Sequence, residues 1–438
     1  MPKILFIALL GLFLSVQAQI APTRVGPVSQ YGKLITGKNN SGKGQIYGSC
    51  DGVISGKEVQ VKGMSLFWSV GSEGYLFYND ASVSKLVSDM KIQIIRAAIG
   101  TDDKWGEDVW NSGYILNPSY QKALLEAVIE SAIKNDVYVI IDWHSHKADK
   151  QTNEAKAFFS EMAQKYGKYD NVIFEIFNEP ESISWSSIKS YADVVVAEIR
   201  KHSSNLIIVG TPKWDQEPHT AIGNALNYQN IAYAFHYYAG SHCYSGKTSW
   251  GSDCEGTNAV KAMNAGLSVF VSEWGTVNAN GDGNVASSND GWQDWMDSHK
   301  LSWANWSVSN KAEGASIFGT NATATDNWNY TASGNYVKQK LASNPSSYTS
   351  CHTTSISKVQ QQSGIQLNAL TRGIRLSASQ NSSIQIQVFD MLGQSVFSKN
   401  EHFNQGTYII PLENIAPGNY IVKAKNANQV QTISLQIQ

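Results

Sequence analysis

Two glutamates each follow a short apolar run, which could bring both carboxylates to one edge of a sheet. In Asn171–Pro180 the apolar run leads to Glu179, and in Leu267–Trp274 a similar run leads to Glu273. Such runs are too short for helices and are typical of buried parallel strands. Pro180 cannot donate a strand hydrogen bond, so the first strand should end there. Two strand-end carboxylates could act as the acid/base and the nucleophile of retaining glycosidic-bond hydrolysis. The alternative is that each is a solvated glutamate at a strand end.

The elements that would position these glutamates alternate along the middle of the chain. Helical patterns, for example over 120–134 and 187–202, separate most of eight strand-like runs. These runs are residues 61–67, 92–99, 137–143, 172–177, 206–210, 231–237, 267–273 and 302–307. The alternation predicts an α/β fold, a (β/α)₈ TIM barrel, whose strands carry catalytic residues at their carboxyl ends. An open doubly wound sheet is the alternative, but no G-x-G-x-x-G follows the first strand.

The sequence on either side of the barrel predicts two further parts. Residues 28–34 and 45–61 have the pattern of a small N-terminal β-hairpin. Near residue 345 the composition becomes rich in Ser, Asn, Pro and Thr, which is typical of a linker. Beyond it, apolar residues alternate at Ile384, Ile386 and Val388, which predicts a small all-β, Ig-like sandwich. We therefore expect a barrel over 28–345, a linker over 346–365 and a sandwich over 366–438.

The first residues have the pattern of an export signal. Lys3, an apolar stretch over residues 4–14 and a small residue at Ala18 predict a signal peptide over residues 1–18. No later stretch approaches the ~20 apolar residues of a membrane-spanning helix, so no membrane span is expected. The formal net charge is −2. Such a chain has no strongly basic surface, which argues against nucleic acid or an anionic membrane as the partner.

The four cysteines are even in number, which favours disulfide bonds in an exported protein. Cys243 and Cys254 would close a short loop and are expected to pair, which leaves Cys50 to pair with Cys351. A metal site is the competing interpretation. However, no C-x-x-C spacing supports it.

The Asn178-Glu179-Pro180 and Ser272-Glu273-Trp274 motifs, together with the strand order, resemble glycoside hydrolase family 5 over residues 28–341. The similarity is closest to bacterial endo-β-1,4-glucanases (cellulases). It implies hydrolysis of internal bonds of cellulose or related β-glucans by double displacement, with Glu179 as the acid/base and Glu273 as the nucleophile. It calls for no cofactor, and we expect a monomer that acts on a β-glucan polysaccharide.

The resemblance also implies roles for residues around the glutamates. The matching residues of the cleaved sugar's subsite are Arg96, His144, Asn178, His236, Tyr238 and Trp306, and a pair contacting the neighbouring sugar is Lys311 and Glu313. The family often has a histidine in a segment M-S-S-H-G after the first strand, where this chain has residues 64–68, MSLFW. The non-reducing side of the cleft could therefore be built differently.

Physical chemistry makes several of these roles reasonable. A nucleophilic carboxylate must stay ionised, which Arg96 would favour, whereas the acid needs a raised pKa. Asn178 could donate to the sugar 2-hydroxyl. Indoles at strand ends could stack on sugar rings; the candidates are Trp68, Trp143, Trp214 and Trp274, with Trp214 expected on the leaving-group side and Trp68 at the other end. Each residue could instead be structural: the arginine in an ion pair, the histidines and indoles in the core.

The C-terminal segment resembles the sorting domain of type IX secretion cargo in Bacteroidetes-like bacteria. The matching stretches are residues 388–393, VFDMLG, and 412–422, LENIAPGNYIV. The similarity implies that the secretion machinery is a partner and that the protein is secreted or at the cell surface. The tail lacks the usual terminal basic residue. A cellulose-binding module is the alternative, but this segment contains no Trp for a flat aromatic platform.

Three other functions compete with an endo-β-1,4-glucanase. An endo-β-1,4-mannanase or another β-glycanase of the same family would share the catalytic pair. A metal-dependent hydrolase could use the H-x-H motif of His144 and His146, although this motif normally ends the first strand of such barrels. A non-catalytic carbohydrate-binding protein would not need the acidic pair.

Overall fold

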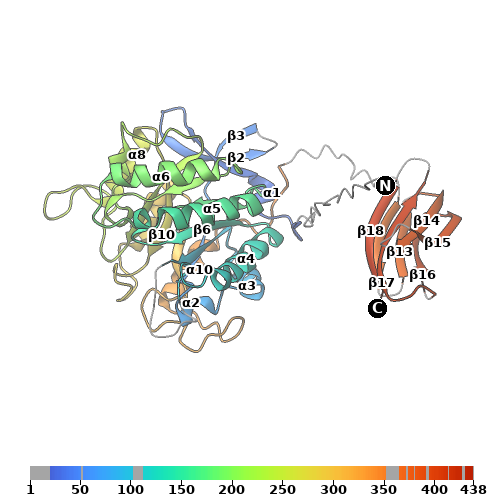
Figure 1. Ribbon diagram of the computed structural model, residues 1–438. Coiled ribbons are helices and arrows are strands. Elements are labelled where there is room, and N and C mark those ends of the chain that lie inside the picture. Colours follow the sequence, from blue (N-terminus) through green and yellow to red (C-terminus); the bar gives the residue numbers. More distant parts are fainter. Residues whose placement is uncertain are drawn as a thin grey trace, which may run out of the picture. The chain divides into compact units, whose positions relative to one another are not determined.

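The structure is a computed structural model that describes residues 20–50, 53–101, 112–351, 365–370, 373–378, 380–390, 394–412, 414–426 and 430–437. The expected signal peptide lies entirely outside these ranges, as does most of the expected linker. The chain divides into two compact units, Met1–His352 and Thr353–Gln438. Figure 1 shows a mixed α/β unit and an all-β unit, which are described separately below.

Eight parallel strands close into a barrel within the described part of the first unit, in the order β10-β11-β4-β5-β6-β7-β8-β9. The strands are β4 (Lys62–Leu66), β5 (Ile94–Gly100), β6 (Tyr138–His144), β7 (Val172–Glu175), β8 (Ile207–Val209), β9 (Ile231–Tyr238), β10 (Ser268–Gly275) and β11 (Trp303–Val308). Each lies within two residues of one of the predicted runs. The predicted (β/α)₈ barrel is therefore confirmed.

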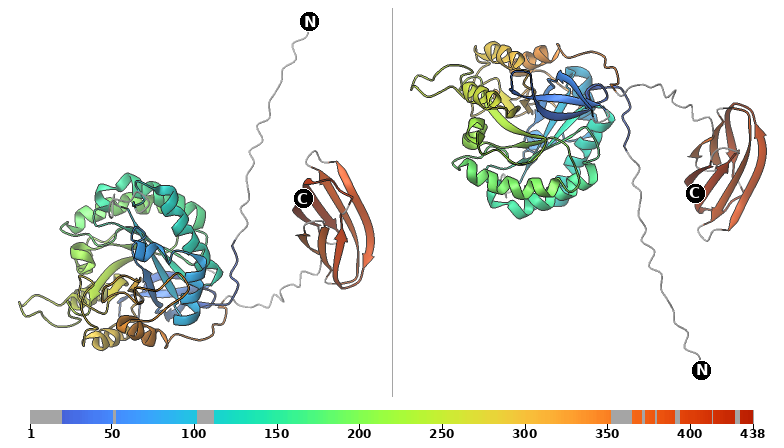
Figure 2. Two further views of the ribbon diagram at one scale, coloured as in Figure 1. Left: turned by 90° about the horizontal axis from the view of Figure 1, so that it is seen from below. Right: turned by 90° about the horizontal axis from the view of Figure 1, so that it is seen from above.

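Helices surround the barrel, as the two views in Figure 2 show. They include α3 (Asp80–Met90), α4 (Pro118–Lys134), α5 (Thr152–Tyr166), α6 (Trp185–Ile199), α8 (Glu255–Asn264), α9 (Asn289–Ser298) and α10 (Ala332–Leu341), with the short α2 (Ser72–Tyr75) and α7 (Pro212–Asp215). In α6, the Ser184 side chain caps the first turn, and Ile188, Ala192, Val195 and Ile199 are buried. Their spacing of three to four residues places them on one face, which packs against the strands.

The barrel strands are buried on both faces, which explains their continuous apolar sequences. One cluster fills the barrel interior and includes Ile94, Ile140, Ile173, Ile208 and Phe270. A larger cluster lies mainly between strands and helices and includes Ile95, Val139 and Phe174. This packing leaves the strand ends as the places where polar side chains can face solvent.

The N-terminal segment covers the end of the barrel at which the strands begin. It contains α1 (Pro27–Tyr31) and an antiparallel sheet of β1 (Lys33–Lys38), β2 (Gly44–Cys50) and β3 (Val53–Glu58). The predicted hairpin was therefore incomplete, because residues 28–31 are helical and three strands are present. Proline at the start of a helix is favourable, since its missing N–H would have no partner there. The Tyr138 hydroxyl, at the start of β6, donates to the Gly32 carbonyl at 2.5 Å.

Both predicted disulfide bonds are present. Cys50 is joined to Cys351, with 6.0 Å between the Cα atoms, and this bond links the covering sheet to the segment after α10. Cys243 is joined to Cys254, with a Cα separation of 5.1 Å, in the loop between β9 and α8. The first bond thus ties together the two ends of the barrel unit, and the second holds a loop at the carboxyl ends of the barrel strands.

The C-terminal unit is a sandwich of two antiparallel sheets in its described residues. One contains β12 (Ile365–Leu370), β13 (Gly373–Ala378) and β16 (Gly406–Pro411), and the other contains β15 (Ser395–Phe403), β14 (Ser382–Asp390), β17 (Gly418–Lys425) and β18 (Val430–Ile437). Ile384, Ile386 and Val388 are fully buried, as their alternation predicted. Strands β12 and β13 were not predicted. None of the helices in the described residues is long and apolar enough to cross a membrane.

Candidate active site

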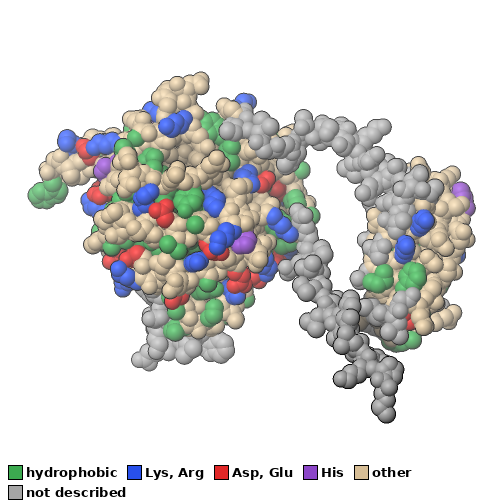
Figure 3. Space-filling model, turned by 45° about the horizontal axis from the view of Figure 1, so that its top comes forward, with side chains coloured by type: hydrophobic (Ala, Val, Ile, Leu, Met, Phe, Trp, Pro, Cys, Tyr) green, Lys and Arg blue, Asp and Glu red, His purple; other side chains and the backbone are tan. Residues whose placement is uncertain are grey.

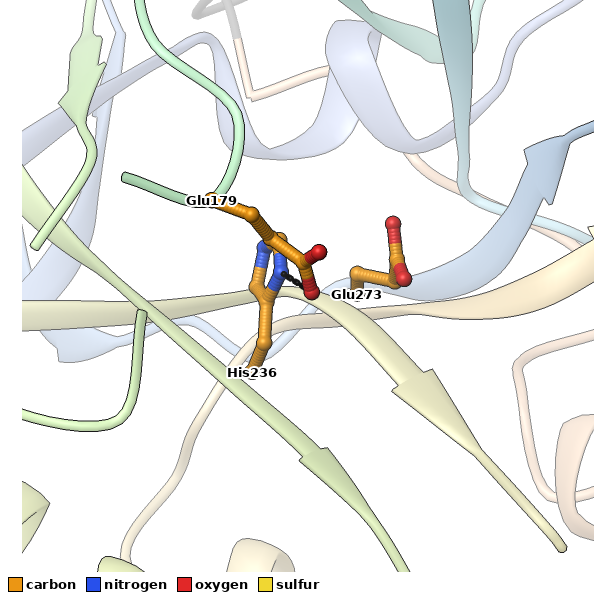
Figure 4. Close-up of side chains that lie close together, drawn as sticks. All are labelled: Glu179, His236 and Glu273. Carbon is orange, nitrogen blue, oxygen red and sulfur yellow. Dashed lines mark hydrogen bonds and ion pairs between the residues drawn. The ribbon is translucent and has the colours of Figure 1, made fainter. Parts of the chain in front are cut away.

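Glu179 and Glu273 meet at the carboxyl ends of the barrel strands. Glu179 follows β7, and Glu273 lies near the end of β10. Figure 4 shows the two carboxylates facing a common space, with His236 of β9 beside Glu179. One oxygen of each carboxylate and one ring nitrogen of His236 all lie within 4.8 Å of one another. Both glutamates line a cleft with a volume of about 630 Å³. The structure thus brings the two glutamates together in one cleft.

Arg96, on β5, lies beneath the cleft and has no exposed surface. Its guanidinium donates to Glu175 at 2.6 Å, to Glu273 Oε2 at 2.8 Å and to Asn178 Oδ1 at 2.7 Å, and pairs with Asp142 at 2.9 Å. Burial alone would lower the pKa of Arg96, but the surrounding carboxylates raise it well above its usual value. The guanidinium is therefore a fixed positive charge that orients Glu273.

The second oxygen of Glu273 is held by Tyr238, whose hydroxyl donates to Oε1 at 2.6 Å. Burial, together with the charges of Glu273 and Glu179, raises the pKa of Tyr238 well above its usual value, so the hydroxyl keeps its proton. Each oxygen of Glu273 thus accepts a short hydrogen bond from a different strand. This leaves the carboxylate little freedom to rotate.

Glu179 is surrounded by histidines. Its Oε1 lies 3.2 Å from His236 Nδ1, and its Oε2 lies 3.5 Å from His146 Nε2. Burial alone would raise the pKa of Glu179, but the hydrogen bond and charge of His236, followed by the charge of His146, lower it. This direction is opposite to the raised pKa that the sequence argument expected of an acid.

His236 carries the positive charge responsible for this effect. Burial alone would lower the pKa of His236, but Asp215, Glu175 and Glu179 raise it well above its usual value. With both ring nitrogens protonated, Nδ1 donates to Glu179 and Nε2 donates to the Ser272 hydroxyl at 2.9 Å. Glu179 therefore has a proton-bearing neighbour within hydrogen-bond distance.

An aromatic wall forms one side of the cleft. The His144 ring stacks on Trp306, with ring centroids 5.4 Å apart and planes 6° from parallel. The ring centroids of Trp68 and Trp306 are 6.1 Å apart. His144 Nδ1 lies 2.7 Å from Asp142 Oδ2, and burial lowers the pKa of His144 to about 3, so its ring is neutral. These three predicted residues therefore offer flat surfaces together with one imidazole nitrogen.

Of the other predicted residues, some line the cleft and some are buried. Lys311 and Glu313 line the cleft and form an ion pair at 2.5 Å. Trp214 also lines the cleft and is 40% exposed. Trp143 and Trp274 are completely buried, so these two indoles are core residues and not sugar platforms. Arg96 and Asn178 act from below the cleft surface.

The two histidines of the H-x-H motif contact different carboxylates. His144 contacts Asp142, whereas His146 Nδ1 contacts Glu181 at 3.0 Å. In the described part of the chain, neither histidine belongs to a cluster of three or more potential metal ligands. The cluster that does occur consists of Glu179, His236 and Glu273.

Sequence reasoning missed the buried acids behind the site. Asp142, Glu175 and Asp215 have no exposed surface, and none was predicted. A charged residue within an apolar strand, such as Asp142 or Glu175, normally requires a buried partner. That signal could have linked these two residues to Arg96. His242 and Gln216, which line the cleft, were also missed and lie in loops without such a signal.

Comparison with known proteins identifies the barrel. The model of the cellulase family, glycosyl hydrolase family 5, matches residues 53–312. The chain belongs to this family. Endoglucanase Z of Dickeya dadantii is 44% identical over 65% of the chain and 62% of its own length. An endoglucanase of Clostridium saccharobutylicum is 37% identical over 78% of the chain and 73% of its own length. The chain thus spans about three fifths to three quarters of these relatives.

Solved structures are also similar to the chain. A structure from Cytophaga hutchinsonii is 37% identical with a TM-score of 0.63, and covers 72% of the chain and 96% of its own. The catalytic domain of endoglucanase Cel5A of Thermobifida fusca in complex with cellotetraose is 30% identical with a TM-score of 0.61. It covers 73% of the chain and 100% of its own length. Residues 370–438 match the secretion system C-terminal sorting domain. The predicted sorting domain is thus confirmed, and it indicates a secreted or cell-surface protein.

Proposed function

We propose that the protein is a retaining endo-β-1,4-glucanase that hydrolyses internal bonds of cellulose or a related β-glucan. The spacing of the two carboxylates carries the proposal. Retaining glycosidases place them about 5–5.5 Å apart, whereas inverting enzymes need about 6.5–9.5 Å for a water molecule. Oxygens of Glu179 and Glu273 within 4.8 Å of each other agree with the shorter spacing. The endoglucanases named above support the substrate class.

In the first step, Glu273 attacks the anomeric carbon while the bond to the leaving sugar breaks. Arg96 and Tyr238 hold the two oxygens of Glu273, so the nucleophile is oriented before the substrate arrives. Glu179 donates a proton to the leaving oxygen. The products of this step are a glycosyl ester on Glu273 and a free sugar hydroxyl.

His236 supplies the proton that Glu179 needs. The carboxylate of Glu179 accepts a hydrogen bond from Nδ1 of His236, which can pass this proton to it. A sugar bound over Glu179 excludes water, which favours the neutral carboxyl. In the second step, the Glu179 carboxylate takes a proton from a water molecule, whose oxygen attacks the anomeric carbon and releases Glu273.

Asn178 binds the sugar 2-hydroxyl. An arginine can only donate hydrogen bonds, so the contact with Arg96 fixes Oδ1 toward the arginine and Nδ2 away from it. Nδ2 is buried and has no hydrogen-bond partner among the described residues. A buried unpaired donor is unfavourable, and a substrate hydroxyl would remove this cost.

The remaining residues bind sugars along the cleft. Trp306, with His144 stacked on it, supports the sugar that is cleaved, and Trp68 extends this wall. Trp214 serves as a platform on the leaving-group side, and Lys311 and Glu313 contact a neighbouring sugar. The C-terminal sandwich is recognised by the type IX secretion machinery.

Substitution of the two glutamates tests the proposed roles. Glu273→Gln should abolish turnover of every substrate. Glu179→Ala should still cleave aryl cellobiosides with good leaving groups, and azide should restore their turnover with formation of a β-glycosyl azide. Equal losses in both variants on all substrates, without azide rescue, would refute the assignment.

Reducing-sugar release tests the substrate preference. Release from carboxymethylcellulose should exceed that from galactomannan and xylan; the opposite order would favour a mannanase or xylanase.

A further inference from the structure

Asp215 is a buried carboxylate that lies directly behind Glu179. It is the last residue of α7, the short turn that follows β8, and it has no exposed surface. Its Oδ2 accepts a hydrogen bond from the backbone N–H of Glu179 at 3.1 Å. Its Oδ1 accepts one from the backbone N–H of Thr211. Asp215 therefore joins the end of β7, which carries Glu179, to the end of β8.

The backbone on both sides of this contact is left-handed. Residues 213–215 have φ values of 59°, 54° and 62°, and Glu179 has φ 49°. Residues other than glycine rarely adopt this conformation, which persists where surrounding contacts enforce it. Two further bonds join the segments: the N–H of Trp214 donates to the Pro180 carbonyl at 2.9 Å, and that of Lys213 donates to the Glu181 carbonyl at 3.2 Å. The position of Glu179 thus depends on the turn that contains Asp215.

Asp215 also faces the imidazole that protonates Glu179. Its Oδ2 lies 3.5 Å from Nε2 of His236, whose Nδ1 contacts Glu179. The other ionisable groups near Asp215 are Glu175 and Glu179. Lys213 and Glu217, on the same segment as Asp215, form a more exposed pair at 3.8 Å. Burial raises the pKa of Asp215 to about 7, in spite of the opposing effect of His236. His236 is therefore placed between two carboxylates, one in the cleft and one behind it.

We propose that Asp215 is a positioning residue for the acid/base step. It fixes the left-handed backbone of Glu179 and keeps His236 as the proton-bearing neighbour of the Glu179 carboxylate. Asp215 does not line the cleft, so it acts through these two residues and not on the substrate. This inference rests on the proposed role of Glu179 as the acid/base.

The test compares Asp215→Asn with the unchanged protein on cellopentaose and on 2,4-dinitrophenyl β-cellobioside. The asparagine has nearly the same size, but it removes the charge and turns an NH₂ group toward one of the two backbone N–H donors. The dinitrophenolate leaves without a proton, so this substrate does not need the acid. The value of kcat/KM reports the first step. It should fall about tenfold to a hundredfold on cellopentaose, as for a misplaced catalytic group, and change little on the aryl substrate.

A merely structural role would lower both rates together, and that result would overturn the proposal, as would no loss on either substrate. Asp215→Ser provides a second variant for the same comparison if the asparagine variant does not fold. Glu217→Gln, which removes a more exposed charge from the same segment, should leave both rates unchanged. Glu179→Ala is measured in parallel: if it shows no dependence on the leaving group, the proposed function fails, whereas dependence there but not at Asp215 refutes only this inference.

The pH profile tests the role of the Asp215 charge. A nearby negative charge favours proton binding by the His236–Glu179 pair. In Asp215→Asn, the basic limb of kcat/KM for cellopentaose should therefore move to lower pH, and in Glu217→Gln it should not move. A basic limb at the same pH in all three proteins would overturn the proposed coupling to His236.

Discussion

Removal of the Cys50–Cys351 bond should destabilise the barrel unit more than removal of the Cys243–Cys254 bond. The two bonds close loops with sequence separations of 301 and 11 residues. In the chain-entropy model, these lengths correspond to at most about 6 and about 3 kcal/mol at 25 °C. The larger value arises because the terminal bond restrains nearly the whole unfolded barrel.

The assay is thermal unfolding of the double variants Cys50→Ser/Cys351→Ser and Cys243→Ser/Cys254→Ser. With about 2.1 cal/mol/K per residue, a unit of about 330 residues has an unfolding entropy of about 0.7 kcal/mol/K. The expected decreases in Tm are therefore about 8 °C and about 4 °C. The second variant should also raise KM for cellopentaose, because His242, next to Cys243, lines the cleft. Equal decreases in Tm, or a higher KM only in the first variant, would refute this reasoning.

Other predictions follow from the site. Trp214→Ala should lower kcat/KM on cellopentaose by a factor that corresponds to a loss of about 1–3 kcal/mol of transition-state stabilisation, with base–aromatic stacking as the analogue. The rates on short aryl substrates should not change. An unchanged cellopentaose rate would make Trp214 a packing residue. Asn178→Ala should lower kcat/KM more on a cellobioside than on its 2-deoxy analogue, because only the former has the 2-hydroxyl, and equal losses would contradict this contact. Burial alone would raise the pKa of Glu175, but Arg96 lowers it to about 2. The free energy of unfolding should therefore decrease as pH falls from about 4.5 toward 2, and Glu175→Gln should weaken this dependence in chemical denaturation; an identical pH dependence in the variant would contradict it.

The barrel could be predicted because its strands are buried on both faces, so each reads as a short apolar run. Glu179 and Glu273 could be predicted because parallel strands bring their carboxyl ends to one face. The three-stranded sheet at the other end was harder to predict, since Leu34 is the one buried residue of β1 and Pro27 begins a helix where a strand was expected. Strands β12 and β13 were missed although their apolar residues alternate as those of β14 do, with Ile365 and Leu367 buried in β12 and Ile374 and Leu376 buried in β13.

The electrostatics of the site could not be predicted from local sequence. The lowered pKa of Glu179 depends on His236, which comes from a different strand. The charge of His236 depends in turn on Asp215, a residue in a turn with no distinguishing motif. Trp143 and Trp274 stand at strand ends like Trp214, but their side chains face the core. Which face a strand-end side chain takes is decided by packing against the helices, and sequence spacing alone does not reveal it.

The stereochemistry of hydrolysis tests the central claim most directly. Glu179 and Glu273 act by double displacement in this account, so the first product from cellopentaose must keep the β configuration at its new anomeric carbon. Proton NMR of the anomeric signals during the first minutes of reaction should show the β-anomer before mutarotation produces the α-anomer. Initial appearance of the α-anomer would contradict the retaining mechanism and the roles of both glutamates.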